Sequence, residues 1–302
     1  MAKRALMVCN PISRGVPDGD VLRAAAVAVP GWQIDIESTR AAGHAIELAR
    51  AAAARGYDAV VACGGDGTVN EVANGVARSQ TPLAVVRGGT ANVWAKEIGV
   101  PKQPARALRL LASGETRAVD LGLAGERYFL LMAGVGFDAA IVRDLSSAAK
   151  RRFGAAAFVL SGLRRAIGYR AADAELVADG ESLSGRLHWA LLGNTRSYGG
   201  LLNIFDRARL DDGRLDLLLL REAGLGRLLW LLPFVLLHRH RSRAHLLARE
   251  VTSFNVATAG LPVQIDGEYL GETPLSFSVA PSALRVIVPP GLRSLLFSRD
   301  QP

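Results

Sequence analysis

A glycine-rich loop at residues 63–71 has the composition of a phosphate-binding site. It reads Cys-Gly-Gly-Asp-Gly-Thr-Val-Asn-Glu and lies between a short apolar run and a helical pattern. Its three glycines let the backbone approach a ligand closely and adopt positive φ angles. Thr68 can cap the following helix, whose free N–H groups form an anion site. We therefore expect a phosphate group to bind at this loop.

The loop matches neither of two common nucleotide-binding motifs. It lacks the lysine of a Walker A loop, and Asn70 stands where the dinucleotide fingerprint has its third glycine. Asp66 adds a carboxylate, which repels phosphate unless a cation lies between them, so a role linked to Mg²⁺ explains it economically. The alternative is a tight turn in which Asp66 only accepts hydrogen bonds.

Three further loops are expected to line the same crevice, because each follows a predicted strand. Residues 87–92 (Arg-Gly-Gly-Thr-Ala-Asn) repeat the order of strand, glycines and helix. Residues 10–15 (Asn-Pro-Ile-Ser-Arg-Gly) follow the first strand, and Thr39 with Gly43-His44 follows the second. In parallel sheets, ligands bind at the carboxyl ends of the strands. Arg87 either adds a cation there or is an ordinary surface arginine.

The elements that position these loops alternate regularly over the first hundred residues. Apolar runs predict strands at 4–9, 32–37, 58–63 and 83–87, and helical patterns occupy 21–29, 44–55, 68–77 and 91–98. Such an order implies a parallel sheet with helices on both faces.

The pattern changes near residue 119 to short alternating segments separated by turn signals such as Asp179-Gly180, Asp212-Gly213 and Asp266-Gly267. The segments lie at 127–133, 174–178, 186–192, 214–220, 251–257, 262–265, 275–279 and 284–288. They predict an antiparallel sandwich or barrel with a helical insertion near 225–247. We therefore expect a first domain at 1–118, a second at 119–302, and an active site in the cleft between them.

Composition limits the class of protein. Half of the 302 residues are hydrophobic, and Lys and Arg exceed Asp and Glu by eight, which suits nucleic acid, anionic lipid or phosphate-bearing partners. The first residues lack the pattern of a signal peptide, so a cytoplasmic protein is expected. Cys9 and Cys63 are predicted to be small buried hydrophobes in a reducing compartment.

An apolar run at 225–237 is too short to span a bilayer, which needs about 20 apolar residues. It precedes a basic cluster at 238–243, and basic residues also flank the apolar stretch 153–163. Either these segments pack on the protein's own core, or they touch lipid with their cations at the headgroups.

Five segments along the chain carry distinctive motifs: NPISRG (10–15), GGDGTVNEVANGV (64–76), GGTANVWAKEIGVP (88–101), LDDGRLDLLLL (210–220) and QIDGEYLGETP (264–274). Together they resemble the diacylglycerol kinase catalytic-domain family, which includes bacterial lipid kinases and sphingosine kinases. The resemblance implies an α/β nucleotide-binding domain like that of NAD kinases and phosphofructokinases, then an antiparallel β-sandwich. It also implies that about the last eight residues return to the first domain. The implied activity is transfer of a phosphoryl group from ATP, with Mg²⁺, to a hydroxyl of a diacylglycerol-like or sphingoid-like lipid.

The resemblance also implies site residues. The catalytic group would comprise Asp66 and Asp120 near magnesium, with Asp266 and Glu268 supplying the general base; a simple hairpin turn is the alternative for the latter pair. Asp212, with main-chain carbonyls of Arg209 and Arg214, would hold a structural Mg²⁺, unless this too is only a hairpin turn. The nucleotide would bind to Asn10, Ser13, Gly15, Thr39, Gly64, Gly65, Asp66, Gly67, Thr68, Asn70, Glu71, Gly89, Thr90 and Asn92.

Three positions depart from the family pattern. Val93 replaces an aspartate that usually follows the asparagine of the second loop, Arg87 replaces a proline-containing approach, and Asp206 stands where proline is common. Val93 leaves open a catalytically impaired nucleotide- or lipid-binding protein. A second alternative is a soluble-substrate kinase resembling NAD kinase, which shares the GGDGT loop. Asp138, in Gly136-Phe137-Asp138, either borders the lipid cleft or makes a structural hydrogen bond.

The expected partners follow from the same resemblance. They are a membrane lipid as substrate and an anionic membrane surface, touched at the inner face, with a homodimer left open. Nucleic acid is not expected, because no aromatic-interleaved basic motif is present.

Overall fold

The computed structural model describes residues 2–145, 162, 165, 168–200, 202–221 and 246–298. The predicted helical insertion near 225–247 and the basic and apolar segments at 150–165 lie almost entirely outside the described residues. The chain forms two units. The first contains Met1–Leu121, Leu210–Asp212 and Pro281–Pro302, and the second contains Gly122–Arg209 and Gly213–Ala280.

The first unit is built on a parallel sheet in the order β4-β3-β1-β2. Its strands are β1 (Lys3–Cys9), β2 (Trp32–Ser38), β3 (Ala59–Gly64) and β4 (Leu83–Arg87). Every residue of β3 is buried, as expected for a central parallel strand covered on both faces. The free Cys9 and Cys63 lie in register on β1 and β3 and are buried, as the sequence predicted.

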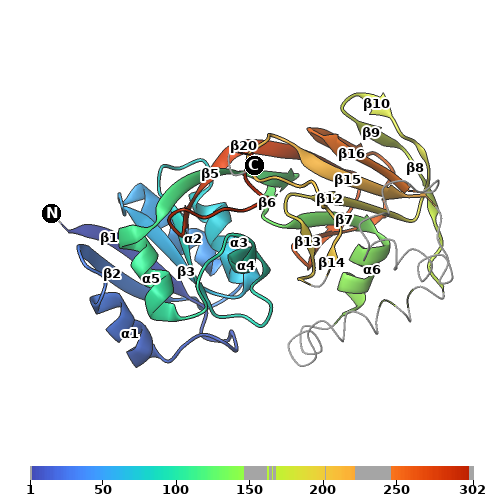
Figure 1. Cartoon of the computed structure of the whole chain (residues 1–302). Helices are drawn as coiled ribbons and strands as arrows, with labels where there is room; N and C mark the ends of the chain where they lie inside the picture. Colours follow the sequence, from blue (N-terminus) through green and yellow to red (C-terminus); the bar gives the residue numbers. More distant parts are fainter. Residues whose placement is uncertain are drawn as a thin grey trace. The chain divides into compact units, whose positions relative to one another are not determined.

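Helices cover this sheet in two groups (Figure 1). The first group packs α2 (His44–Ala54) on α3 (Asp66–Val76), and the second packs α1 (Gly19–Val27) on α5 (Pro104–Ser113). Right-handed crossovers from β1 to β2 and from β2 to β3 run in opposite directions, which puts α1 and α2 on opposite faces. The short α4 (Val93–Glu97) follows β4.

The second unit contains two antiparallel sheets. One has the order β16-β15-β12-β7-β18-β19, and the other runs through β10, β9, β17 and β20. The strands of the first sheet are β7 (Met132–Gly136), β12 (Trp189–Gly193), β15 (Leu215–Leu220), β16 (Leu246–Val251), β18 (Pro262–Ile265) and β19 (Glu268–Glu272). The strands of the second are β9 (Leu176–Ala178), β10 (Glu181–Ser182), β17 (Ser253–Val256) and β20 (Leu275–Val288).

Shorter elements complete the fold. They are β5 (Glu115–Ala124), β6 (Arg127–Phe129), α6 (Phe137–Asp144), β8 (Ala172–Ala174), β11 (Gly185–Leu187), β13 (Ser197–Tyr198) and β14 (Leu202–Asn203).

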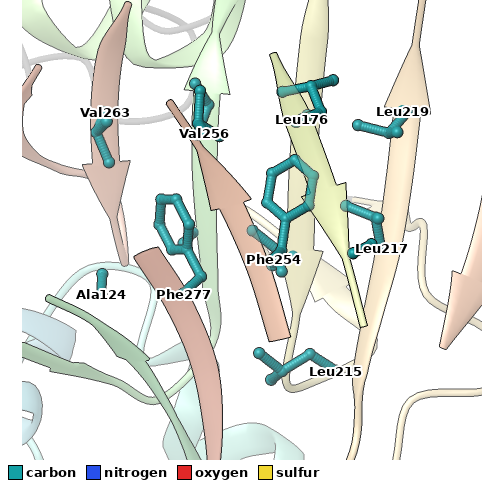
Figure 2. Close-up of a cluster of buried hydrophobic side chains, with 14 of the residues drawn as sticks. Ala124, Leu176, Leu215, Leu217, Leu219, Phe254, Val256, Val263 and Phe277 are labelled. Atoms are coloured by element: carbon teal, nitrogen blue, oxygen red, sulfur yellow. The ribbon is translucent and has the colours of Figure 1, made fainter. Parts of the chain in front are cut away.

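The core of the second unit lies between its two sheets. Figure 2 shows Phe254 and Phe277, from one sheet, in a cluster with leucines of β15 from the other. All of these side chains are nearly inaccessible to water. Because they fill the space between two separate sheets, the second unit is a sandwich rather than a barrel. The predicted fold class, a parallel α/β domain followed by an antiparallel β-sandwich, is confirmed.

Several details differ from the sequence prediction. The predicted strand 186–192 divides at His188 into β11 and β12, which belong to different sheets. Two predicted strands, 275–279 and 284–288, are one strand, β20, which pairs with β17 in the second unit and with β4 in the first. The return to the first unit begins at Pro281, earlier than the last eight residues. Of the helices that the structure describes, none combines the length and apolarity needed to cross a membrane.

Candidate active site

Three of the predicted loops meet at the carboxyl edge of the parallel sheet. The Gly15 N–H donates to the Gly88 carbonyl at 2.9 Å, and the Gly88 N–H donates to the Gly64 carbonyl at 2.8 Å. The loop after β1 is also tied to β3, because the Asn10 N–H donates to the Cys63 carbonyl at 2.9 Å. Residues 10–15, 64–66 and 88–89 therefore form one continuous backbone surface next to the start of α3.

Close backbone approach explains the glycines of this surface. A Cβ atom at Gly89 would lie 2.5 Å from the Cα of Gly65. A Cβ atom at Gly88 would lie 2.5 Å from Cγ2 of Val16, and one at Gly64 would lie 2.5 Å from the Thr68 hydroxyl. Because real Cβ atoms do not approach other atoms so closely, glycine at 88 and 89 lets the loops pack together, and Gly64 leaves room for the Thr68 side chain.

Gly89→Ala should therefore push the second glycine loop away from the first. We expect a loss of about 1–3 kcal/mol of stability from the clash and at least a tenfold loss of ATP affinity, measured by urea denaturation and by calorimetric titration with Mg-ATP. Gly65→Ala is the stability control, since its Cβ would lie 3.4 Å from the Gly89 Cα, an ordinary contact. Equal destabilisation by both substitutions would contradict this explanation.

Two asparagines shape the loops. The Asn10 side chain donates to the Thr68 hydroxyl at 3.1 Å and accepts from the Ile12 N–H at 3.2 Å. Asn92, with φ of 48°, accepts from the Gly89 N–H at 2.9 Å and donates to the Gly89 carbonyl. Thr68 and Asn70 are buried at the start of α3, Ser13 and Thr39 are half-buried, and Thr90 is exposed.

The Glu71 carboxylate faces another helix rather than the glycine surface. It accepts from the Gly43 N–H at 2.9 Å and from the Ala45 N–H at 3.2 Å, at the first turn of α2. Carboxylates stabilise helix N-termini by satisfying free N–H groups and by opposing the helix dipole. Glu71 therefore joins α3 to α2, and any influence that it has on a nucleotide is through this scaffold.

Asp66 links the two glycine loops through its side chain. It is the first residue of α3, and one carboxylate oxygen accepts from the Trp94 N–H at 3.1 Å, at the start of α4. The neighbouring Val93 is buried, so the position where the family usually has an aspartate contributes apolar packing instead.

Asp120 lies on β5 and is buried. Its carboxylate accepts from the Ser282 N–H at 2.7 Å, while its own N–H donates to the Leu210 carbonyl at 2.6 Å. Among the described residues, no three His, Cys, Asp or Glu side chains are grouped to hold a metal. Single carboxylates such as that of Asp66 fit a Mg²⁺ ion whose other ligands are phosphate oxygens and water.

The 209–214 segment has a carboxylate with a structural role that the sequence did not reveal. Asp211 accepts from the Ser298 N–H at 2.8 Å and from the Ser298 hydroxyl at 2.7 Å. Asp212 is half-buried, Gly213 has a φ of 70°, and Arg214 lies 3.9 Å from Glu250. The cation site at Arg209, Asp212 and Arg214 stays a prediction.

The two acids at the turn between β18 and β19, Asp266 and Glu268, have different surroundings. The Asp266 carboxylate accepts from the N–H groups of Leu130 at 2.8 Å, Leu131 at 2.8 Å and Met132 at 3.0 Å. Asp266 is thus a latch that holds the turn to the beginning of β7. Glu268 is the first residue of β19 and its side chain is exposed. Of the two acids, Glu268 has the freedom to meet a substrate.

Asp138 makes a structural hydrogen bond, the second of the two expectations for this residue. It is 1% exposed at the start of α6, and its carboxylate accepts from the Gln264 side chain at 2.8 Å and from the Ala139 N–H at 2.7 Å. Burial raises the pKa of Asp138 to about 7, although these hydrogen bonds oppose the rise.

The pH dependence of stability should report this carboxyl. With a pKa of about 7 in the folded protein and about 4 when unfolded, Asp138 makes the folded state bind more protons between these values. Its contribution to stability is therefore complete below pH 4, falls as the pH rises to 7, and is level above. From pH 5 to 7 this amounts to about 2–3 kcal/mol. Urea denaturation of Asp138→Asn should lack this decline, and an unchanged pH slope would contradict the assignment.

Two family models match successive parts of the chain. Residues 4–124 match the diacylglycerol kinase catalytic domain, and residues 132–288 match the YegS C-terminal NAD kinase beta sandwich-like domain. The chain is 38% identical over 269 residues to a Pseudomonas putida protein named "Probable lipid kinase YegS-like", covering 86% of this chain and 87% of that protein. It is 30% identical over 263 residues to the diacylglycerol kinase of Bacillus subtilis, again covering 86% and 87%.

A solved structure shares the fold. The crystal structure of a diacylglycerol kinase from Bacillus anthracis has a TM-score of 0.78 with this chain at 23% identity, covering 96% of this chain and 98% of that one.

Proposed function

Because this chain belongs to the diacylglycerol kinase family, we propose that it is a lipid kinase that transfers the γ-phosphate of Mg-ATP to a hydroxyl group of a membrane lipid. The observation that carries the proposal is the backbone surface at which residues 10–15, 64–66 and 88–89 meet. Because such a surface has no side chains in the way, a phosphate can approach the N–H groups and the dipole at the start of α3, and a lysine is not required.

The chain's own residues would divide the work of binding. Backbone N–H groups of the first turn of α3 would hold the phosphates, with Asn10, Thr68 and Asn92 keeping the glycine loops in place beside them. Asp66 and Asp120 would hold Mg²⁺, in part through water. That ion would neutralise the phosphate oxygens during transfer.

Glu268 is the proposed general base. As the lipid hydroxyl oxygen attacks the γ-phosphorus, its proton passes to the Glu268 carboxylate, the bond to the β-phosphate oxygen breaks, and ADP leaves. Asp266 supports this step by fixing the turn, because its carboxylate is occupied by three backbone donors.

A diacylglycerol-like or sphingoid-like lipid is the proposed acceptor, met at the inner face of the membrane by a cytoplasmic protein. The relatives that match most of the chain carry names of diacylglycerol or lipid kinases, which supports a lipid over a soluble acceptor.

The test uses purified protein, ATP labelled at the γ-phosphate, Mg²⁺ and vesicles that contain diacylglycerol or sphingosine, beside NAD as a soluble acceptor. We expect label in the lipid phase, none on NAD, and no transfer when EDTA removes Mg²⁺. Label on NAD alone would establish the soluble-substrate alternative, and Mg-ATP binding without transfer to any acceptor would establish a catalytically impaired protein.

A further inference from the structure

A buried chain of hydrogen bonds lies behind the turn that carries Glu268. The Gly267 N–H donates to the side-chain oxygen of Gln264 at 2.8 Å, and the Gln264 side-chain NH₂ donates to Oδ2 of Asp138 at 2.8 Å. The Ala139 N–H donates to the other Asp138 oxygen at 2.7 Å. Gln264 is 2% exposed and Asp138 is 1% exposed, so water does not compete for these groups.

The donor and the acceptor of each of these hydrogen bonds follow from the chemistry of the groups. The Gly267 N–H can only donate, so Gln264 must turn its oxygen toward Gly267 and its NH₂ toward Asp138. The Asp138 carboxylate then accepts from Gln264 with one oxygen and from Ala139 with the other. Neither an amide at position 138 nor a carboxylate at position 264 can preserve this pattern alone.

A glycine in β7 clears the path for this contact. Gly134 pairs with Gln264 on the neighbouring strand β18. A Cβ atom at Gly134 would lie 2.1 Å from Oδ2 of Asp138, so a larger residue would expel the carboxylate. The helix α6, which carries Asp138, packs against β18 and β19. The carboxylate thus reaches across β7 to the hairpin, and this route is independent of the Asp266 latch.

We propose that Asp138 and Gln264 are positioning residues that orient Glu268 for proton removal from the acceptor hydroxyl. The proposal rests on the proposed function of Glu268 as general base. Both residues before Glu268 are held from outside the turn: Asp266 by the N–H groups of residues 130–132, and Gly267 by Gln264. Holding a catalytic group within a fraction of an ångström is worth large factors in rate.

Two phenols and an imidazole lie near Asp138, and their pKa values fall outside the pH range in which Asp138 titrates. Burial raises the pKa values of the Tyr169 and Tyr198 phenols and lowers that of His188 to about 4. On the elements packed against Asp138, the charged side chains are Arg143 and Asp144 of α6 and Glu268 and Glu272 of β19. Among Asp138, the two phenols and the imidazole, only Asp138 titrates between pH 6 and 8, so assays at pH 8 keep it ionised.

The experiment reverses the hydrogen bond between positions 138 and 264, so that position 138 donates and position 264 accepts. Asp138→Asn and Gln264→Glu should each lower kcat for lipid phosphorylation about 10- to 100-fold, with the KM for ATP within twofold of wild type. The double substitution places an amide donor at 138 opposite a carboxylate at 264. The new carboxylate then accepts from both Gly267 and position 138, and kcat should recover to within about fivefold of wild type.

Asp179→Asn is the matched control in the same unit. The Asp179 carboxylate accepts from the N–H groups of Thr252 at 2.9 Å and Ser253 at 2.8 Å, away from the turn. Its loss should lower stability while leaving kcat within twofold of wild type. Single variants that keep the wild-type kcat, or a double variant that regains stability but not kcat, would overturn the positioning role.

A measurement without substrate separates this proposal from the proposed function. Amide hydrogen exchange at Gly267, followed by NMR, should be slow in wild type, faster in each single variant, and slow again in the double variant. If wild type phosphorylates no lipid, the proposed function fails, and the exchange pattern still decides the hydrogen-bond chain. Fast exchange at Gly267 in wild type would overturn that chain even in an active kinase.

Discussion

Replacing Glu268 by glutamine should lower kcat for lipid phosphorylation by about 10²- to 10⁴-fold, the usual contribution of a general base. Glutamine keeps the size of the side chain but cannot accept the proton of the attacking hydroxyl at neutral pH. Because Glu268 is exposed at the start of β19, the free energy of unfolding should change by no more than about 0.5 kcal/mol. Initial rates at saturating Mg-ATP and lipid, with urea denaturation of the same samples, give both quantities.

Glu272→Gln is the control for this substitution. Glu272 ends the same strand, is exposed, and lies 3.3 Å from Arg143 in a surface ion pair. Surface pairs contribute about 0–1 kcal/mol, so stability and kcat should both stay near wild type. A Glu268→Gln enzyme that retains more than a tenth of the wild-type kcat would remove Glu268 from the role of base.

The parts of the fold that the sequence predicted are those with local signals. The strand predicted at 58–63 is β3 (Ala59–Gly64), because a short apolar run before glycines identifies a buried strand without knowledge of its partners. Helix α5 was missed, although Pro104 at its first turn and buried residues at 107, 108, 110 and 111 are typical helix signals.

Pairing between distant strands was not predictable in the same way. No local sequence feature near His188 indicates that β11 pairs with β8 while β12 pairs with β7 in a different sheet. The two partners of β20 are likewise decided by tertiary contacts, since Val286 pairs with Leu83 far earlier in the chain. Alternating patterns indicate a strand but not its neighbours.

The candidate site likewise has features that the local sequence predicts and features that depend on remote partners. Glycine loops that follow strands were recognisable, because glycine spacing reflects local backbone demands. The roles of individual carboxylates were not, since their partners are remote. Glu71 binds an N–H group 28 residues away, Asp266 binds one 136 residues away, and Gln264 meets Asp138 across 126 residues. The sequence therefore predicted the same role for Asp266 and Glu268, whereas Asp266 accepts three backbone hydrogen bonds and Glu268 is exposed.

The second large expected effect is a loss of stability on substituting Asp266, because its carboxylate, unlike that of Glu268, is held by backbone donors. Asp266→Ala should cost about 3–5 kcal/mol, because the N–H groups of Leu130, Leu131 and Met132 lose their acceptor together. The backbone of this turn adds to the cost, since Asp266 has a φ of 49°, which aspartate tolerates better than alanine. Urea denaturation at pH 7.5 measures the loss directly.

Two further variants separate the latch from the turn geometry. Asp266→Asn tolerates the same φ and keeps one acceptor oxygen, but its NH₂ group faces a backbone donor, so its cost should be about half that of Asp266→Ala. Asp266→Gly removes both acceptor oxygens, and with them all three hydrogen bonds, but relieves the backbone strain, so it should be destabilised less than Asp266→Ala by about 1 kcal/mol. Because the latch fixes the residue two positions before Glu268, all three variants should lose kcat, and they should lose it in the order of their lost stability. A variant that unfolds as readily as Asp266→Ala but keeps wild-type kcat would show that the latch holds the sandwich together without directing Glu268.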